Sequence, residues 1–184
     1  MIGKTNKSRF ILIVAVSLDG RITQGTKEGT EWTSKEDQRF FRGELDRADV
    51  VILGRKTFDT IVRPLTPRNR IVFTRKKLFS NSQKFENKTG DCTTVAFSGF
   101  PEKLRSLLRR HDWRRVVIAG GTFVYEWFLK NKLVDEIYLT LEPVIFGSGK
   151  PFLASISTES DWILTSVKKL NKRGTMLLHY QVNK

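Results

Sequence analysis

The sequence predicts an α/β protein: a single domain with a mostly parallel central sheet flanked by helices, and antiparallel strands at its C-terminal end. Three observations predict this class. Short, continuous apolar runs indicate strands covered on both faces, helical patterns alternate with these runs, and the last two strand patterns flank a short polar turn. Strands that alternate with helices are typical of parallel sheets, whereas neighbouring strands joined by a tight turn pair antiparallel.

The strands are predicted from their apolar content. Residues 10–16 read FILIVAV, a β-branched run, and shorter apolar runs occur at 50–53, 70–74, 94–97 and 116–119. Residues 136–144 alternate in polarity, and 162–169 and 176–182 follow as strands paired across the turn at 171–174. These segments make up the predicted sheet.

Helical patterns fill most of the gaps between these strands. A helix is expected to begin at Thr33 or Ser34, with Glu36 or Asp37 completing a capping box, and others are expected at 55–61, 101–110 and 122–129. Residues 25–31 are small and polar, which favours a mobile loop that closes over a site. Residues 63–68 form a proline-containing loop, and 78–93 are expected to be a long surface connection.

Composition excludes several classes of protein. The 184 residues are 39% hydrophobic, which suits one domain over residues 1–184, with residues 1–9 as a flexible basic arm. No apolar run reaches the roughly 18 residues of a membrane span, so a soluble, cytoplasmic protein is expected. Cys92 is the only cysteine, and His111 and His179 lack companions at metal-ligand spacing, so no metal site is expected.

The net charge of +14 is the one unusual feature of the composition. A strongly basic protein suggests a nucleic-acid partner, and a nucleic-acid-binding protein without catalytic activity is therefore one alternative. The basic residues are dispersed along the chain, however, and no RNA-recognition, zinc-finger or helix-turn-helix signature accompanies them. A basic solvated surface that attracts small anionic ligands is the preferred interpretation. No pattern in the sequence specifies an oligomeric state.

Asp37 is the first candidate for a functional residue. It lies one turn before Phe41 on the apolar face of its predicted helix, which continues through Leu45 and Ala48. A buried carboxylate without a partner is costly, so Asp37 either stays partly solvated in the first turn or receives donors from a ligand. An ionised carboxylate can accept two parallel hydrogen bonds from a 2-amino-pyrimidinone or pterin ring and stabilise positive charge that develops there.

Two glycine turns suggest a dinucleotide cofactor. Gly120 and Gly121 separate a buried strand from a helix, and Gly54 precedes the basic segment RKT at 55–57 in the same way. Arg75 follows a third strand, where it is expected to meet an extra phosphate, which favours NADPH over NADH. Because no nucleophile or metal set is evident, hydride transfer by this cofactor is the preferred chemistry.

These motifs together resemble the dihydrofolate reductase family along most of the chain. The matching segments, in order, are Trp32 with Asp37 and Phe41, GRKTF at 54–58, RPL with Arg68 at 63–68, GGTFVYE at 120–126, and YLT at 138–140. The resemblance implies a dihydrofolate-reductase-like fold and NADPH-dependent reduction of 7,8-dihydrofolate to tetrahydrofolate, in folate and one-carbon metabolism. Asp37 would then act as an electrostatic and proton-relay residue.

The resemblance also implies a set of site residues. The catalytic group would be Asp37, Trp32 and Thr140, with a water near Trp32. The substrate would meet Ile13, Val14, Gln38, Phe41, Ile61, Leu65, Arg68 and Ala119, with Arg68 on the carboxylate of the glutamate tail. NADPH would meet Ala15, Ile22, Gly54, Arg55, Lys56, Thr57, Thr74, Arg75, Gly120, Gly121, Thr122, Phe123, Val124 and Tyr125.

Other segments are similar to the reductase domain of riboflavin biosynthesis. These are SLDGRI at 17–22, LVDE at 133–136 and PVIFGSGKP at 143–151. The resemblance implies, as an alternative, a reductase acting on a phosphorylated ribosylamino-pyrimidine with the same cofactor. Gln38 and Ala119 depart from the dihydrofolate reductase pattern, so the chain combines features of two families. Dihydrofolate remains the preferred substrate, because a substrate without a distal carboxylate would give Arg68 no carboxylate to bind.

Overall fold

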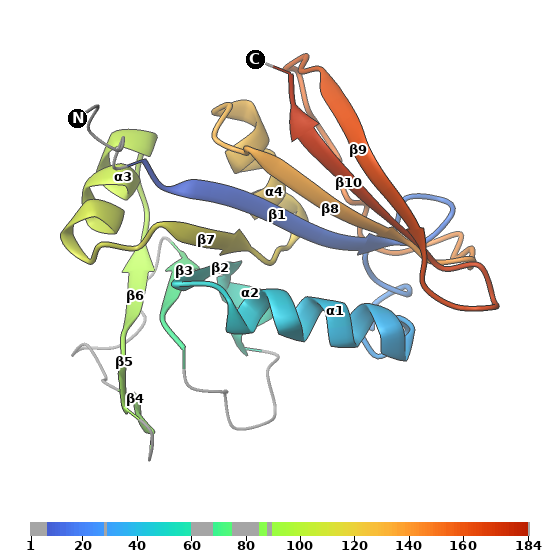
Figure 1. Ribbon diagram of the computed structural model, residues 1–184, viewed down its shortest axis with the longest axis horizontal. Helices are drawn as coiled ribbons and strands as arrows, with labels where there is room; N and C mark the ends of the chain where they lie inside the picture. Colours follow the sequence, from blue (N-terminus) through green and yellow to red (C-terminus); the bar gives the residue numbers. More distant parts are fainter. Residues whose placement is uncertain (1–6, 28, 60–67, 75–84, 88–89, 184) are drawn as a thin grey trace.

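The computed structural model describes residues 7–27, 29–59, 68–74, 85–87 and 90–183. An eight-stranded sheet crosses the molecule (Figure 1). In spatial order its strands are β6 (Thr94–Phe97), β3 (Arg70–Phe73), β2 (Val50–Gly54), β7 (Arg115–Ile118), β1 (Arg9–Val16), β8 (Glu136–Leu141), β10 (Met176–Val182) and β9 (Trp162–Lys169).

The strands from β6 to β8 all run parallel to one another. The last two strands, β10 and β9, are added by antiparallel pairing. β1 pairs in parallel with β7 and β8, whereas β10 pairs antiparallel with β8 and with β9. The predicted α/β class, with a mostly parallel sheet and antiparallel C-terminal strands, is therefore confirmed.

Helices cover both faces of the sheet. Figure 1 shows α1 (Lys35–Asp46) on one face, with α3 (Pro101–Arg110) and α4 (Thr122–Lys130) on the other. Leu12 and Val14 of β1 point into the larger core with α3 and α4, while Ile11 and Ile13 meet α1. This alternation explains why the β1 sequence is apolar at nearly every position. The short helix α2 (Arg55–Asp59) follows β2 directly.

Some predicted boundaries differ from the structure. The strand predicted at 136–144 ends at Leu141, because Pro143 cannot donate a backbone hydrogen bond to the ladder. The connection predicted at 78–93 contains a short antiparallel pair, β4 (Phe85–Asn87) and β5 (Gly90–Cys92), so the prediction of a continuous loop is wrong there. Of the predicted basic arm, residues 1–6 lie outside the described residues, and Arg9 already belongs to β1.

Two kinds of feature are absent from the residues that the structure describes. No helix among them is long and apolar enough to cross a membrane. They also contain no group of three His, Cys, Asp or Glu side chains that could hold a metal ion.

Phe128 tests the packing of the larger core. Its side chain is fully buried, and its ring centroid lies 5.5 Å from that of Phe10 and 5.6 Å from that of Phe73. We expect Phe128→Ala to lower the free energy of unfolding by about 3–5 kcal/mol in urea titrations, because it leaves a cavity between sheet and helix. Phe123→Ala on the same helix is the matched control, since Phe123 is 67% exposed. Equal losses in the two variants would contradict this packing.

Candidate active site

A cavity of about 500 Å³ opens at the carboxyl end of β1. Its walls come from β1, from the segment that follows β7, from α1, and from the residues between β1 and α1. Ligands of open parallel sheets bind at this edge, outside the carboxyl ends of the strands. The cavity is therefore the first candidate for an active site.

Asp37 lies in the cavity wall although it is only 6% exposed. Ser34 is the N-cap of α1, and its hydroxyl accepts a hydrogen bond from the Asp37 backbone N–H at 3.3 Å. Burial raises the pKa of the Asp37 carboxyl, the nearby Thr140 and Thr33 hydroxyls oppose that rise, and the negative charge of Glu142 adds to it. The first turn of α1 thus presents a carboxylate held largely out of water.

Trp32 and Tyr125 supply further polar atoms near Asp37. The indole Nε1 of Trp32 is buried and has no hydrogen-bond partner among the described residues, although its ring packs edge-on against Phe146. The Tyr125 hydroxyl donates to the Ile13 carbonyl at 2.9 Å, and burial, reinforced by the charge of Asp37, raises its pKa. An indole N–H left without a protein acceptor is a donor for water or a ligand.

The glycine turns bring backbone segments and side chains close together beside the cavity. Gly120 has φ +105°, and a Cβ there would lie 2.8 Å from the Tyr125 hydroxyl oxygen. A Cβ on Gly121 would point toward Ile22 and Thr57, which line the same cavity. The Gly54 N–H donates to the Gly120 carbonyl at 2.8 Å, so the two turns meet.

The N-terminus of α4 adds backbone donors to these turns. Gly121 is the N-cap of α4 and supplies no side-chain cap. A helix start with glycine in place of a capping side chain fits a phosphate group.

The structure brings most of the sequence-predicted residues to this cavity. Those that line it are Ile13, Val14, Ala15, Ile22, Trp32, Asp37, Gln38, Phe41, Thr57, Ala119, Gly120, Gly121 and Tyr125. Thr140 lies behind Asp37 and is fully buried. Ile61, Leu65 and Arg75 lie outside the described residues.

Several predicted cofactor residues make other contacts. Arg55 pairs with Asp59 at 2.6 Å, and the Thr122 hydroxyl donates to the Pro151 carbonyl. Gly54 and Val124 pack against each other beside the cavity, and Thr74 donates its backbone N–H to Phe97. Lys56 and Phe123 are exposed. None of these seven predicted residues lines the cavity.

Arg68 lies apart from the cavity wall, near the far end of α1. Its Nη2 donates to Asp46 Oδ1 at 3.0 Å, and its side chain is only 12% exposed. Its Nη1 is buried and has no hydrogen-bond partner among the described residues. Asp37 and Asp46 stand near opposite ends of α1, about 13 Å apart along the helix axis.

Sequence reasoning missed four polar residues at or near the site. Arg42 and Lys150 line the cavity, and Glu142 and Thr175 are buried behind Asp37. Arg42 could have been found, since it lies one turn after Gln38 on the same helix. Glu142 and Thr175 come from distant segments and carry no local signal, whereas Lys150 lies in the segment 143–151 that resembles the reductase domain of riboflavin biosynthesis. Gln38 itself bonds back to the preceding loop, donating to the Thr33 carbonyl at 3.1 Å.

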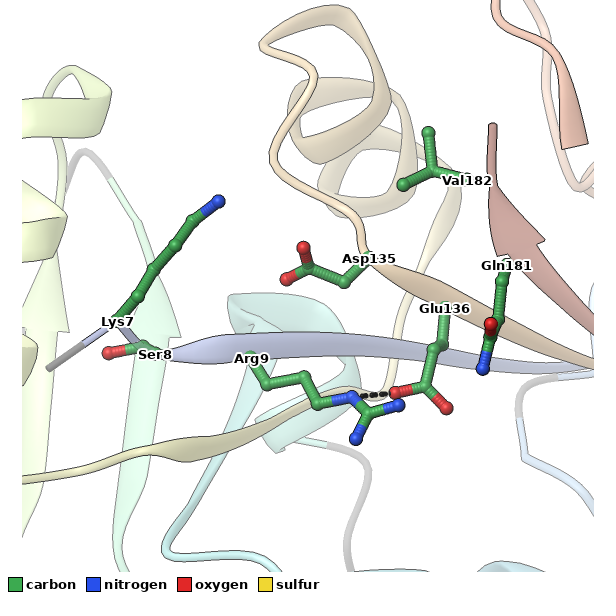
Figure 2. A pocket seen from close by; sticks show the side chains of 7 residues that line it. All are labelled: Lys7, Ser8, Arg9, Asp135, Glu136, Gln181 and Val182. Carbon is green, nitrogen blue, oxygen red and sulfur yellow. Dashed lines mark ion pairs between the residues drawn. The ribbon is translucent and has the colours of Figure 1, made fainter. Parts of the chain in front are cut away.

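A second hollow of about 390 Å³ lies at the opposite edge of the sheet. Figure 2 shows its lining: Lys7, Ser8, Arg9, Asp135, Glu136, Gln181 and Val182. Arg9 pairs there with Glu136, and Asp135 accepts a hydrogen bond from the Phe10 backbone N–H at 3.0 Å. Because these side chains join the first residues of β1 and β8 to each other, the hollow is a weaker candidate for an active site.

Comparison with protein families gives one match over most of the chain. A model described as the RibD C-terminal domain matches residues 9–176. Among curated proteins, the uncharacterized protein YwjB of Bacillus subtilis (strain 168) is 28% identical over 94% of this chain and 97% of its own length. The dihydrofolate reductase of Haemophilus influenzae is 31% identical over 71% of this chain and 70% of its own length.

Solved structures of both kinds share this fold. RibD from Acinetobacter baumannii aligns with a TM-score of 0.77 at 18% identity, covering 97% of this chain and 59% of the RibD chain. Dihydrofolate reductase from Enterococcus faecalis, complexed with NADP(H), aligns with a TM-score of 0.61 at 22% identity, covering 96% of this chain and 97% of that one.

The raised pKa of Asp37 predicts a pH-dependent stability. Between the ordinary carboxyl pKa and the raised native value, the folded state binds the proton more tightly than the unfolded state, so stability falls as pH rises. We therefore expect Asp37→Asn to have a higher Tm than the unmodified protein at neutral pH, and the difference to disappear in acid. Thermal unfolding across pH measures this. Asp161→Asn, at an exposed residue outside the cavity, controls for the loss of one charge, and a pH-independent difference for Asp37→Asn would refute the assignment.

Proposed function

Because this chain belongs to the RibD C-terminal domain family, we propose that it is an NADPH-dependent reductase and that 7,8-dihydrofolate is its substrate. The observation that carries the proposal is the Asp37 carboxylate, 6% exposed in the wall of the cavity. A carboxylate in this position matches a ring that presents an N–H and an amino group side by side, as a pterin does. It also stabilises positive charge on the reduced ring.

Asp37 and Trp32 have complementary roles in this proposal. Asp37 accepts the paired donors of the ring and orients it in the cavity. The Trp32 indole N–H, which has no partner among the described residues, holds a water that moves a proton between solvent and the ring. The buried Thr140 hydroxyl lies near the carboxylate and opposes the rise of its pKa.

The cofactor residues fit a dinucleotide. Gly120, Gly121 and the first turn of α4 offer backbone donors to a phosphate, and Ile22 and Thr57 face the same space. When bound, NADPH supplies the hydride, so the protein has only to position and polarise the substrate. The basic charge of the chain favours the approach of both anionic ligands.

Arg68 supports dihydrofolate as the substrate. Its unpaired Nη1 lies near the end of α1 that is distant from Asp37. A ligand that extends along α1 from the first turn to the last spans about 13 Å, a distance that suits a pterin ring joined to a benzoyl-glutamate tail. The guanidinium then binds the terminal carboxylate.

A phosphorylated ribosylamino-pyrimidine is the second candidate substrate. The match to the RibD C-terminal domain favours it, as do Arg42 and Lys150, two cations that line the same cavity as Asp37, which Arg68 does not. Oxidation of NADPH by the purified protein, measured in parallel with the two substrates, distinguishes the candidates. Turnover with dihydrofolate supports the first. Turnover with the phosphorylated pyrimidine alone would replace it with the second.

Asp37→Asn tests the role of the carboxylate. We expect kcat to fall by about 10²- to 10³-fold at neutral pH, because an amide cannot accept two donors or stabilise positive charge. Circular dichroism checks that the fold is retained. Turnover within about threefold of the unmodified protein would contradict the role. A tenfold change in rate corresponds to about 1.4 kcal/mol of activation free energy, so a change this small would mean that the carboxylate contributes little to the transition state.

Arg68→Gln tests the length of the substrate. We expect the KM for dihydrofolate to rise about ten- to a hundredfold, because a charge-assisted hydrogen bond to the tail is lost. The KM for a dihydropterin without the tail stays unchanged. Asp46→Asn, which breaks the ion pair but leaves Arg68 in place, is the control. An equal effect of Arg68→Gln on both substrates would show that Arg68 does not contact the tail.

A further inference from the structure

Glu142 is a buried carboxylate that the proposed chemistry does not use. It follows the last residue of β8 and is 2% exposed. No ion pair of the described residues includes it. A charge in this environment is tolerated only when hydrogen bonds satisfy its oxygens, so its contacts indicate its purpose.

Both carboxylate oxygens of Glu142 accept hydrogen bonds from neutral donors. The Ser34 backbone N–H donates to Oε1 at 2.7 Å, and the Thr175 hydroxyl donates to Oε2 at 2.7 Å. Ser34 is the N-cap of α1, so Glu142 binds the residue that starts the helix carrying Asp37. Thr175 is fully buried and immediately precedes β10.

Asn171 extends this network to the turn between β9 and β10. Its Nδ2 donates to the Thr175 hydroxyl at 3.0 Å and to Glu36 Oε2 at 3.2 Å, while its Oδ1 accepts the backbone N–H of Thr175 at 3.2 Å. The β9–β10 turn and the first turn of α1 are thus joined twice, through Glu142 and through Glu36. Three segments distant in sequence meet directly behind Asp37.

We propose that Glu142 is a positioning residue for Asp37, which fixes the N-terminus of α1 over the cavity through Ser34 and anchors it to the β9–β10 turn through Thr175. The proposal deepens the proposed function and rests on it. Glu142 also places a second negative charge near Asp37, because the two carboxylates lie on adjoining segments of the same buried region. It therefore favours a protonated Asp37 while holding it in place.

The other groups around Asp37 are few. The hydroxyls of Thr140 in β8 and of Thr33, before α1, lower its pKa, and the Tyr125 hydroxyl of α4 lies nearby. Arg42 and Lys150 are the cations among the described residues that line its cavity. Glu142 is the acidic group whose charge raises the pKa of Asp37, so removing that charge is expected to lower this pKa.

Glu142→Gln tests the proposal, because it removes the charge and keeps an oxygen for the Ser34 N–H. The Tm gain that Asp37→Asn produces at neutral pH is expected to be smaller in the Glu142→Gln background, since Asp37 ionises there at lower pH. The pH profile of kcat/KM moves to lower pH, and kcat/KM falls by about tenfold or more because α1 is less well held. An unchanged Tm gain together with an unchanged pH profile would overturn the proposal.

Glu36→Gln is the matched control. It removes the same charge from the same network, but the Glu36 side chain is not enclosed and water screens it. The Tm gain of Asp37→Asn stays as in the unmodified protein. A Glu36→Gln effect as large as that of Glu142→Gln would assign the result to the network as a whole and overturn the special role of Glu142.

The test of Glu142 depends neither on a single variant nor on a substrate. If Glu142→Gln fails to fold, NMR titration of Asp37 in Thr175→Val, which removes the hydroxyl that holds Glu142, replaces it: the pKa of Asp37 is expected to differ from that in the unmodified protein, and an identical pKa would overturn the proposal. The stability and NMR measurements need no substrate. If neither substrate is reduced, the proposed function fails while the role of Glu142 toward Asp37 is still decided.

Discussion

The carboxylate of Asp37 is held out of water at the first turn of α1, and the surrounding structure is arranged to hold it there. Desolvation disfavours its charge, so the fold must supply compensating contacts or a ligand must bring them. The Thr140 and Thr33 hydroxyls oppose part of the resulting rise in pKa, and the cavity in front of the carboxylate leaves room for a ligand to supply further donors. This constraint connects the helix cap, the end of β8 and the shape of the cavity.

The central sheet makes this arrangement possible because it brings distant segments together at one edge. β1 lies between β7 and β8, so the glycine turn after β7, the end of β1 and Thr140 of β8 become neighbours. α1 packs on one face of these strands through Phe41 and Leu45. The Asp37 carboxylate and the Gly120–Gly121 turn then share a single cavity.

The positions along the chain of the strands of the large sheet, and the capped start of α1, could be predicted because they depend on local patterns: apolar runs such as 10–16 and the serine at position 34. Asp37, Trp32 and the Gly120 turn could be predicted for the same reason. The contacts of Glu142 and Arg68 could not, because each depends on a residue that only the folded chain brings near, namely Ser34 and Asp46. The β4–β5 pair was also missed, because backbone pairing can form without an apolar pattern.

The central claim is that the Asp37 carboxylate receives a pair of ring donors in the cavity. Its most direct test is the affinity of a 2,4-diaminopyrimidine for the unmodified protein and for Asp37→Asn, measured by calorimetry in buffers of different ionisation enthalpy. The account predicts that Asp37→Asn weakens binding by about ten- to a hundredfold and abolishes the proton exchange linked to binding. Equal affinity and equal proton exchange in the two proteins would contradict it.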